Sequence, residues 1–184
     1  MARPASDPPP ESLALIDPEG SEDDADPVEV AKQILLTQLT ASAKSRHQLA
    51  QVLAKRAVPQ AAAEEALDRF TALGYIDDAA FAAAWVDSRR RSRGLAASAL
   101  RRELRDKGID AELVDRVLAE SADPDAERDA ARRLVDKKLR SMRGVDPETA
   151  TRRLVGMLGR KGYRPGVAYE VVKQALAAAS EPIS

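Results

Sequence analysis

The sequence predicts an all-α protein, built as an elongated tandem array of three three-helix repeats. Three observations support this fold class. Alternation of apolar and polar residues, the mark of a half-buried strand, is missing after about residue 28. Glycine and proline recur at intervals of about one helix, and a leucine pattern recurs at a spacing of about fifty residues.

The glycines fall where helices should end, and the prolines fall where helices should begin. These punctuating residues are Pro59, Gly74, Gly94, Gly108, Pro124, Gly144, Pro147, Gly162 and Pro165. They predict nine helices, near residues 28–41, 45–56, 60–73, 78–92, 96–107, 110–121, 125–141, 147–161 and 165–179.

The second helix of each predicted repeat carries the same motif. The segments LAQVLAKRAV, LRRELRDKGI and LVGMLGRKGY start at Leu49, Leu100 and Leu154, so the offsets are 51 and 54 residues. The aligned positions are Leu53, Leu104 and Leu158, then Ala57, Gly108 and Gly162, then Val58, Ile109 and Tyr163, and downstream Leu67, Leu118 and Val172. We expect the aligned leucines to be buried in equivalent places, with repeats at 28–76, 77–123 and 124–184.

Composition narrows the class of protein. The chain of 184 residues has no cysteine, which excludes thiol catalysis and cysteine-ligated metal sites and favours a reducing cytoplasm. No apolar run is long enough to span a membrane, and the first residues lack the basic start and apolar stretch of a signal peptide. We therefore expect a cytoplasmic monomer with no membrane partner.

The net charge of −1 conceals a division along the chain. Residues 1–30 contain nine acidic residues and one basic residue, whereas the rest contains 28 basic and 21 acidic residues. Residues 1–27 are also rich in proline, so we expect an acidic, disordered tail. A basic body behind an acidic tail is typical of proteins that bind polyanions.

The segment LGYIDDAAFAAAWVDSRRR, residues 73–91, reads as a capped helix that ends in like charges. Asp77 and Asp78 can accept hydrogen bonds from the first-turn amides. Helical spacing then places four residues on one face, which are Phe81, Ala84, Trp85 and Ser88. We expect Trp85 to belong to the core. Stacking of Trp85 on a nucleobase is the alternative.

Basic side chains are concentrated where this helix ends and along the next helix. They are Arg89, Arg90, Arg91, Arg93, Arg101, Arg102, Arg105 and Lys107. One cation at a helix end gains about 0.3 to 1 kcal/mol from the helix dipole, but clustered arginines repel one another. A solvated face is one explanation, and a negatively charged partner is the other. We predict that the seven arginines form one partner-binding surface, with Arg101 and Arg105 on a shared face.

The region around these arginines resembles the signature of the bacterial RecX regulatory proteins. The shared features are Leu73 to Asp78, the pair Phe81 and Ala82, Arg89 to Arg91, and the stretch from Arg101 to Ile109. The segment LGRKGYRP, residues 158–165, is similar to the C-terminal repeat of that family. The first 27 residues match nothing in its common pattern.

The resemblance implies a specific function. RecX proteins bind the RecA recombinase filament and suppress its ATPase, strand-exchange and coprotease activities, which modulates DNA recombination, DNA repair and the SOS response. They have no catalytic activity of their own, and their fold is a set of tandem three-helix repeats. The implied partner is therefore a RecA filament, with single- or double-stranded DNA as a further partner.

The residues themselves indicate no enzyme, cofactor or metal site. The glycine-rich phosphate loop of nucleotide-binding proteins is missing, so we interpret GRKGYRPG as a turn. His47 is the only histidine, and no nucleophile lies near a base in the sequence pattern. Two other hypotheses stay open. One is a tandem helix-turn-helix-like module that binds nucleic acid directly, and the other is a purely structural helical adaptor.

Overall fold

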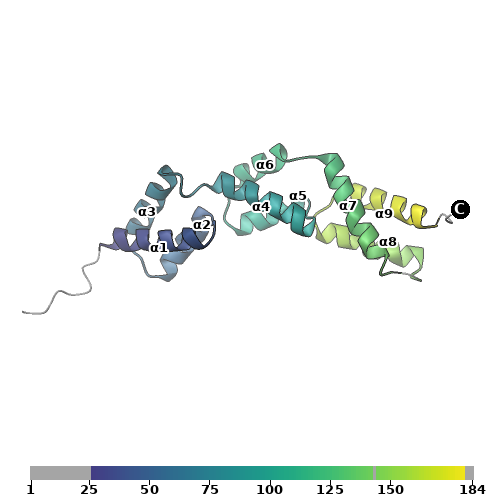
Figure 1. The fold of residues 1–184 in the computed structure, drawn as a ribbon, viewed down its shortest axis with the longest axis horizontal. Coiled ribbons are helices and arrows are strands. Elements are labelled where there is room, and N and C mark those ends of the chain that lie inside the picture. The colour runs from purple at the N-terminus through teal and green to yellow at the C-terminus, as the bar shows by residue number, and fades with distance from the viewer. Residues whose placement is uncertain (1–25, 143, 181–184) are drawn as a thin grey trace, which may run out of the picture.

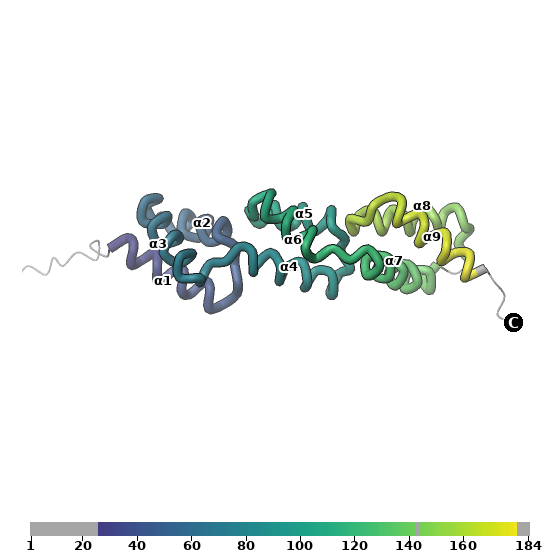
Figure 2. Tube along the Cα trace, turned by 90° about the horizontal axis from the view of Figure 1, so that it is seen from above, coloured from purple at the N-terminus to yellow at the C-terminus, as the bar shows by residue number. Residues whose placement is uncertain are grey.

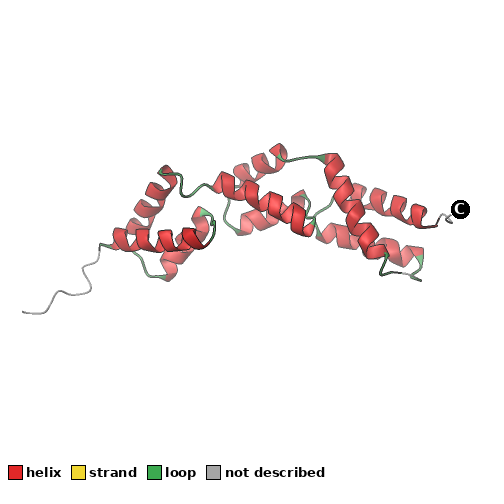
Figure 3. Cartoon of the chain, in the orientation of Figure 1, coloured by secondary structure: helices red, strands yellow, loops and turns green. Residues whose placement is uncertain are grey.

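The computed structural model describes residues 26–142 and 144–180, and within them the regular elements are nine helices and no strand (Figure 3). Each helix end lies within two residues of its predicted position. The helices are α1 (Pro27–Ala41), α2 (Arg46–Lys55), α3 (Gln60–Ala72), α4 (Asp78–Arg93), α5 (Ala97–Asp106), α6 (Ala111–Glu120), α7 (Pro124–Leu139), α8 (Pro147–Arg160) and α9 (Pro165–Ser180). The prediction of a disordered tail falls almost wholly on residues 1–25, which lie outside the described residues.

Short polar side chains start most of the helices. Aspartate caps α1, α4, α6, α7 and α8, and its carboxylate accepts hydrogen bonds from first-turn amides. Asp26 and Pro27, which the sequence analysis assigns to the tail, begin α1 instead. Asp26 accepts a hydrogen bond from Val28 N at 2.9 Å, and Pro27 has a backbone angle suited to the first helical position.

The helices form three successive units along one line (Figures 1 and 2). Unit 1 is α1–α3, unit 2 is α4–α6 and unit 3 is α7–α9. The main helix–helix contacts lie within units, and each unit has its own hydrophobic core. The predicted tandem array of three-helix repeats is therefore confirmed, while the boundaries 28–76, 77–123 and 124–184 stay a prediction.

The registered leucines are the centre of each core. The six leucines of the second helices have no exposed surface, and these are Leu49, Leu53, Leu100, Leu104, Leu154 and Leu158. Their downstream equivalents Leu67, Leu118 and Val172 are also buried. The burial predicted from the repeat alignment is confirmed, because leucines four residues apart share the inward face of a helix.

A short contact joins unit 1 to unit 2. The hydroxyl of Ser45, at the start of α2, donates to Lys107 O at 2.6 Å, and Arg46 N donates to the Asp78 carboxylate at 2.8 Å. Gly108 follows Lys107 with φ +73°, and a Cβ built there would lie 2.2 Å from Cγ of His47. Only glycine allows this approach together with this backbone conformation.

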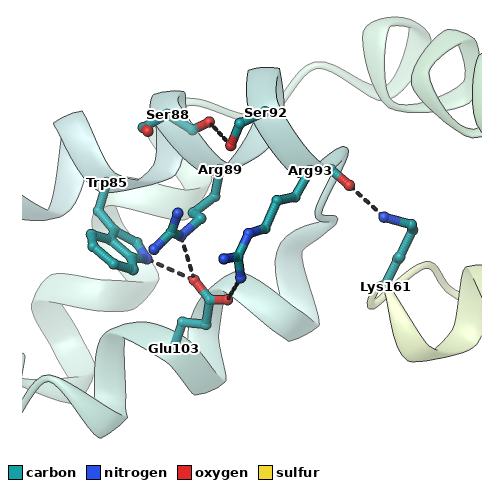
Figure 4. A network of polar contacts seen from close by, with 7 residues as sticks. All are labelled: Trp85, Ser88, Arg89, Ser92, Arg93, Glu103 and Lys161. Atoms are coloured by element: carbon teal, nitrogen blue, oxygen red, sulfur yellow. Dashed lines mark hydrogen bonds and ion pairs between the residues drawn. The ribbon is translucent and has the colours of Figure 1, made fainter.

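An equivalent contact joins unit 2 to unit 3. Ala96 N, at the start of α5, donates to Lys161 O at 2.9 Å, and the Ser98 hydroxyl donates to Gly162 O at 2.8 Å. The Lys161 ammonium donates to Arg93 O at 2.5 Å (Figure 4). The Tyr163 hydroxyl donates to Gly94 O at 3.1 Å. At both junctions, the start of the second helix of one unit therefore contacts the glycine turn that follows the second helix of the next unit.

Replacing Leu104 by Ala should lower the free energy of unfolding by about 2 to 5 kcal/mol, because the substitution leaves a cavity in the core of unit 2. Urea unfolding followed by circular dichroism measures this loss. Leu36→Ala is the control, since Leu36 is 46% exposed and should lose far less. Equal losses in the two variants would contradict the core position of Leu104.

Candidate partner-binding surface

Glu103 on α5 holds the end of α4 through three side chains (Figure 4). Its Oε2 accepts hydrogen bonds from Trp85 Nε1 at 2.8 Å and from Arg89 Nε at 3.1 Å. Its Oε1 lies 3.8 Å from Nη1 of Arg93. Arg89 and Arg93 are four residues apart and so face the same carboxylate. These two arginines contribute to the attachment of α5 to α4.

Trp85 is partly buried, whereas the sequence analysis places it in the core. The buried residues of α4 are Ala82 and Val86, and the predicted stripe of Phe81, Ala84, Trp85 and Ser88 lies at the edge of the core. These four residues line an open hollow of about 450 Å³, together with side chains of unit 1 such as Leu39 and Tyr75. The inward face of α4, at Ala82 and Val86, is therefore one position away from the predicted stripe, because it packs into the core of unit 2.

Two cations lie against the indole ring of Trp85. The Arg89 guanidinium is 3.9 Å and the Lys107 ammonium 3.8 Å from the ring centroid. Phe81 stacks beside the same ring at 6.0 Å. A nucleobase could stack on this ring only by displacing a cation, so the alternative role of Trp85 is disfavoured.

Arg90 and Arg91 lie on other sides of α4. Arg90 donates to the carbonyl oxygen of Ser121, at the end of α6. Arg91 lies 3.6 Å from the carboxylate of Asp87, one turn earlier, and both side chains are exposed. Arg90 therefore fastens α4 to α6, whereas Arg91 stays available to solvent.

A groove of about 810 Å³ lies where units 2 and 3 meet. The six cations that line it come from α4, α7 and the turn after α8, and they outnumber its two acids, Asp123 and Glu127. The cations are Arg90, Arg91, Arg93, Arg133, Lys137 and Lys161. We call this hollow the junction groove. Its excess of positive charge suits an anionic segment.

The arginines of α5 lie away from the junction groove. Arg101 binds Asp115 of α6 with its Nη2 at 2.8 Å from the carboxylate. Arg102 and Arg105 are exposed and form no ion pair in the described part of the chain. Arg101 and Arg105 are four residues apart on the helix, and Arg102 lies beside them. They form the α5 basic face, which we define as Arg101, Arg102 and Arg105.

The seven predicted arginines thus occupy three places: the Glu103 contact, the junction groove and the α5 basic face. Arg93 belongs to the first two. The sequence pattern missed the role of Glu103. This residue lies within the motif LRRELRD, but its partner Trp85 is on the preceding helix, so their contact does not show in the sequence. It also missed Arg133, Lys137 and Lys161, whose distance in sequence conceals their position beside α4. Binding of a partner by the seven arginines stays a prediction.

Burial makes the phenol of Tyr163 a weaker acid than usual. Its hydroxyl lies at the junction of units 2 and 3, and loss of solvent together with the nearby charge of Glu127 raises the pKa of Tyr163 to about 12, against a smaller lowering by Arg133. The phenol therefore stays protonated, and keeps donating to Gly94 O, to a higher pH than an exposed tyrosine would.

The described residues show neither a metal-binding cluster nor a helix suited to a membrane. No group of three or more His, Cys, Asp or Glu side chains there is placed to hold a metal ion. No helix in residues 26–142 and 144–180 is long and apolar enough to cross a bilayer.

Comparison with known families agrees with this architecture. The chain matches the models of the first, second and third three-helix domains of RecX, at residues 31–70, 77–118 and 125–172. The chain belongs to the RecX family. The resemblance of the signature around Leu73 to Ile109 is thereby confirmed.

Curated RecX proteins are similar over most of their length. One from Streptomyces coelicolor, named regulatory protein RecX, is 52% identical over 158 residues, which cover 86% of this chain and 84% of that protein. The regulatory protein RecX of Thermobifida fusca is 45% identical and covers 80% of each chain. These relatives are named as regulators.

Solved RecX structures share the fold. The crystal structure of RecX from Lactobacillus salivarius aligns with a TM-score of 0.75 at 15% identity, covering 83% of this chain and 98% of that one. A second crystal structure, of a regulatory protein RecX, aligns with a TM-score of 0.73 at 24% identity over 81% of this chain and 72% of that one. The three-unit array is thus kept at low sequence identity.

Replacing Glu103 by Ala should lower the free energy of unfolding by about 1 to 3 kcal/mol, because the indole N–H and two guanidinium groups lose their acceptor. Trp85 is the only tryptophan, so its fluorescence reports on this contact alone, and water reaching the indole should shift its emission to longer wavelength. Glu120→Ala is the control, since Glu120 is exposed and forms no ion pair among the described residues. An unchanged emission spectrum in Glu103→Ala would contradict the contact.

Replacing Tyr163 by Phe should change how stability depends on pH. The folded pKa of Tyr163, about 12, lies above its ordinary value of 10.0, so the unfolded chain loses the phenol proton first. The stability that this proton provides is fully present below pH 10 and is lost as the pH rises toward 12. Urea unfolding between pH 8 and 11.5 should show a steeper decline in the wild type than in Tyr163→Phe. Parallel declines would argue against a buried, protonated phenol.

Proposed function

We propose that the chain binds the RecA filament and inhibits its ATPase, strand-exchange and coprotease activities, and that it acts in the cytoplasm without catalysing a reaction. Through this binding it would modulate DNA recombination, DNA repair and the SOS response. Membership of the RecX family in all three units carries this proposal. The elongated array supports it, because a line of units presents a long surface to an extended partner (Figure 2).

The α5 basic face is the part of the surface best suited to contact that partner. Arg102 and Arg105 are exposed and form no ion pair within the described residues, so docking on these two side chains would break no internal ion pair, whereas Arg101 is paired with Asp115. Arg89, Arg90 and Arg93 are already engaged inside the molecule, by Glu103 and by the carbonyl oxygen of Ser121. Acidic side chains of RecA and phosphates of its DNA would both fit the face.

The junction groove favours a second candidate function, which is direct binding of nucleic acid. Its six cations exceed its two acids, and such an excess attracts a phosphate backbone without selecting a sequence. Titration of the protein with DNA alone and then with RecA–DNA filaments separates the two functions. Binding to DNA alone with the same affinity as to the filament would favour the second candidate.

The double substitution Arg102→Glu and Arg105→Glu should weaken inhibition of the RecA ATPase. Each exposed charge pair contributes up to about 1 kcal/mol, so turning two attractions into repulsions should raise the half-inhibitory concentration on the order of tenfold. If phosphates are the target, the slope of the logarithm of the binding constant against the logarithm of the salt concentration should also become shallower by about one for each lost contact. The assay is steady-state ATP hydrolysis by RecA on single-stranded DNA.

A matched control removes the effect of net charge. Arg56 and Arg69 of unit 1 are also exposed and form no ion pair among the described residues, so reversing both changes the net charge by the same amount. Circular dichroism checks that both variants stay folded. An equal loss of inhibition in the two variants would assign the effect to overall charge rather than to the α5 basic face.

A further inference from the structure

The two junctions between units use the same pair of unlike surfaces. One surface is the start of the second helix of a unit, and the other is the glycine turn after the second helix of the following unit. Ser45 meets Lys107 at the first junction, and Ala96 meets Lys161 at the second. Because the two surfaces differ, each junction uses one surface from each unit. One unused turn and one unused helix start therefore remain, at opposite ends of the array. A second copy of the chain could then extend the array unless at least one of the two ends is closed.

The N-terminal end carries the turn. Ala57, after α2, aligns with Gly108 and Gly162 and has the same left-handed backbone, with φ +56° against +73° and +91°. It is the only residue other than glycine with positive φ among the described residues. The turn of unit 1 therefore has the shape of the two turns that accept a neighbouring helix.

The Cβ of Ala57 stands where a docked helix would lie. At Gly108 a Cβ would meet His47 Cγ at 2.2 Å, and at Gly162 it would meet Ala99 N at 2.4 Å. The second of these neighbours is backbone, which cannot move aside without moving the helix. Alanine in a left-handed conformation costs free energy that glycine would not, so the local backbone preference does not explain the alanine at this position.

The C-terminal end carries the helix start, and α8 covers it. Ala150 aligns with Ser45 and Ala96, which stand directly before α2 and α5. In unit 3 the helix begins three residues before Ala150, at Pro147. Ala150 N donates to Asp146 O at 2.9 Å, whereas Ala96 N donates to the turn of the next unit. The extra first turn of α8 thus lies where the other two second helices receive a docking turn, and it engages the Ala150 amide, whose equivalent at Ala96 makes the contact between units 2 and 3.

We propose that Ala57 and the extra first turn of α8 close the two ends of the array, so that copies of this chain do not associate head to tail through the contact that joins its units. The length of the array is then three units. This inference does not depend on the binding of RecA.

The first experiment tests whether a Cβ in the turn breaks the contact. Gly162→Ala should abolish hydrogen-exchange protection of the Ala96 amide, which donates to Lys161 O, while amides within the cores of units 2 and 3 stay protected. Gly74→Ala is the matched control, since Gly74 has φ +75° but no atom within 4 Å of an added Cβ. Gly162→Ala should lower the melting temperature more than Gly74→Ala, because both strain the backbone but only one collides.

Continued protection of the Ala96 amide in Gly162→Ala would overturn the proposal, because the turn would then tolerate a Cβ. So would a wild-type protein that forms head-to-tail oligomers through Ala57. These two outcomes need no change to α8, and they keep the proposal testable even if a shortened α8 does not fold.

The second experiment opens the ends. Ala57→Gly opens the turn, and deletion of Pro147 to Thr149 opens the helix start. Sedimentation velocity up to millimolar concentration should show monomers for the wild type and for each variant alone, dimers for an equimolar mixture, and longer oligomers when one chain carries both changes. Monomers in the mixture, with both variants folded by circular dichroism, would overturn the proposal.

Discussion

The arrangement of the three units depends on two glycine turns. Each unit buries its own leucines, and the main helix packing stays within units, so the cores alone do not fix how one unit sits on the next. Gly108 and Gly162 do, because their missing Cβ lets a helix start approach within hydrogen-bond distance of the turn. Close approach and a left-handed backbone are required at the same residue, which leaves glycine as the residue that meets both.

Most of the arginines at the end of α4 act within unit 2. Arg89 and Arg93 face Glu103 of α5, and Arg90 binds the carbonyl oxygen of Ser121, at the end of α6. A block of like charge is stable there because Arg89 and Arg93 share the Glu103 carboxylate, while Arg90 points to another side of the helix and binds a different acceptor. The arginines of α5 lie away from the junction groove, and among them Arg101 binds the carboxylate of Asp115.

The helices were predictable because their signals are local. Glycine and proline act on the residues next to them, and the period of the leucines reports the inward face of each second helix, so nine helices and six core leucines follow from neighbours in the chain. The site was less predictable because its contacts join distant positions. Glu103 is 18 residues from Trp85, and Lys161 is 68 from Arg93. The exposure of Trp85 also depends on unit 1, because the two together line an open hollow rather than packing tightly.

The basic segment LGRKGYRP gains a definite meaning from these contacts. Its lysine donates to Arg93 O, the last carbonyl group of α4 at the negative end of the helix dipole, and its tyrosine donates to O of Gly94, the residue that caps α4. A segment that could be taken for a phosphate loop therefore recognises the end of a helix in its own chain. Changes to Lys161 or Tyr163 would act on a partner through the angle between units 2 and 3, and changes to Arg102 or Arg105 would act at the surface itself. Under the proposed function, the two classes of residue would have the same effect on inhibition and still differ in the stability of the folded array.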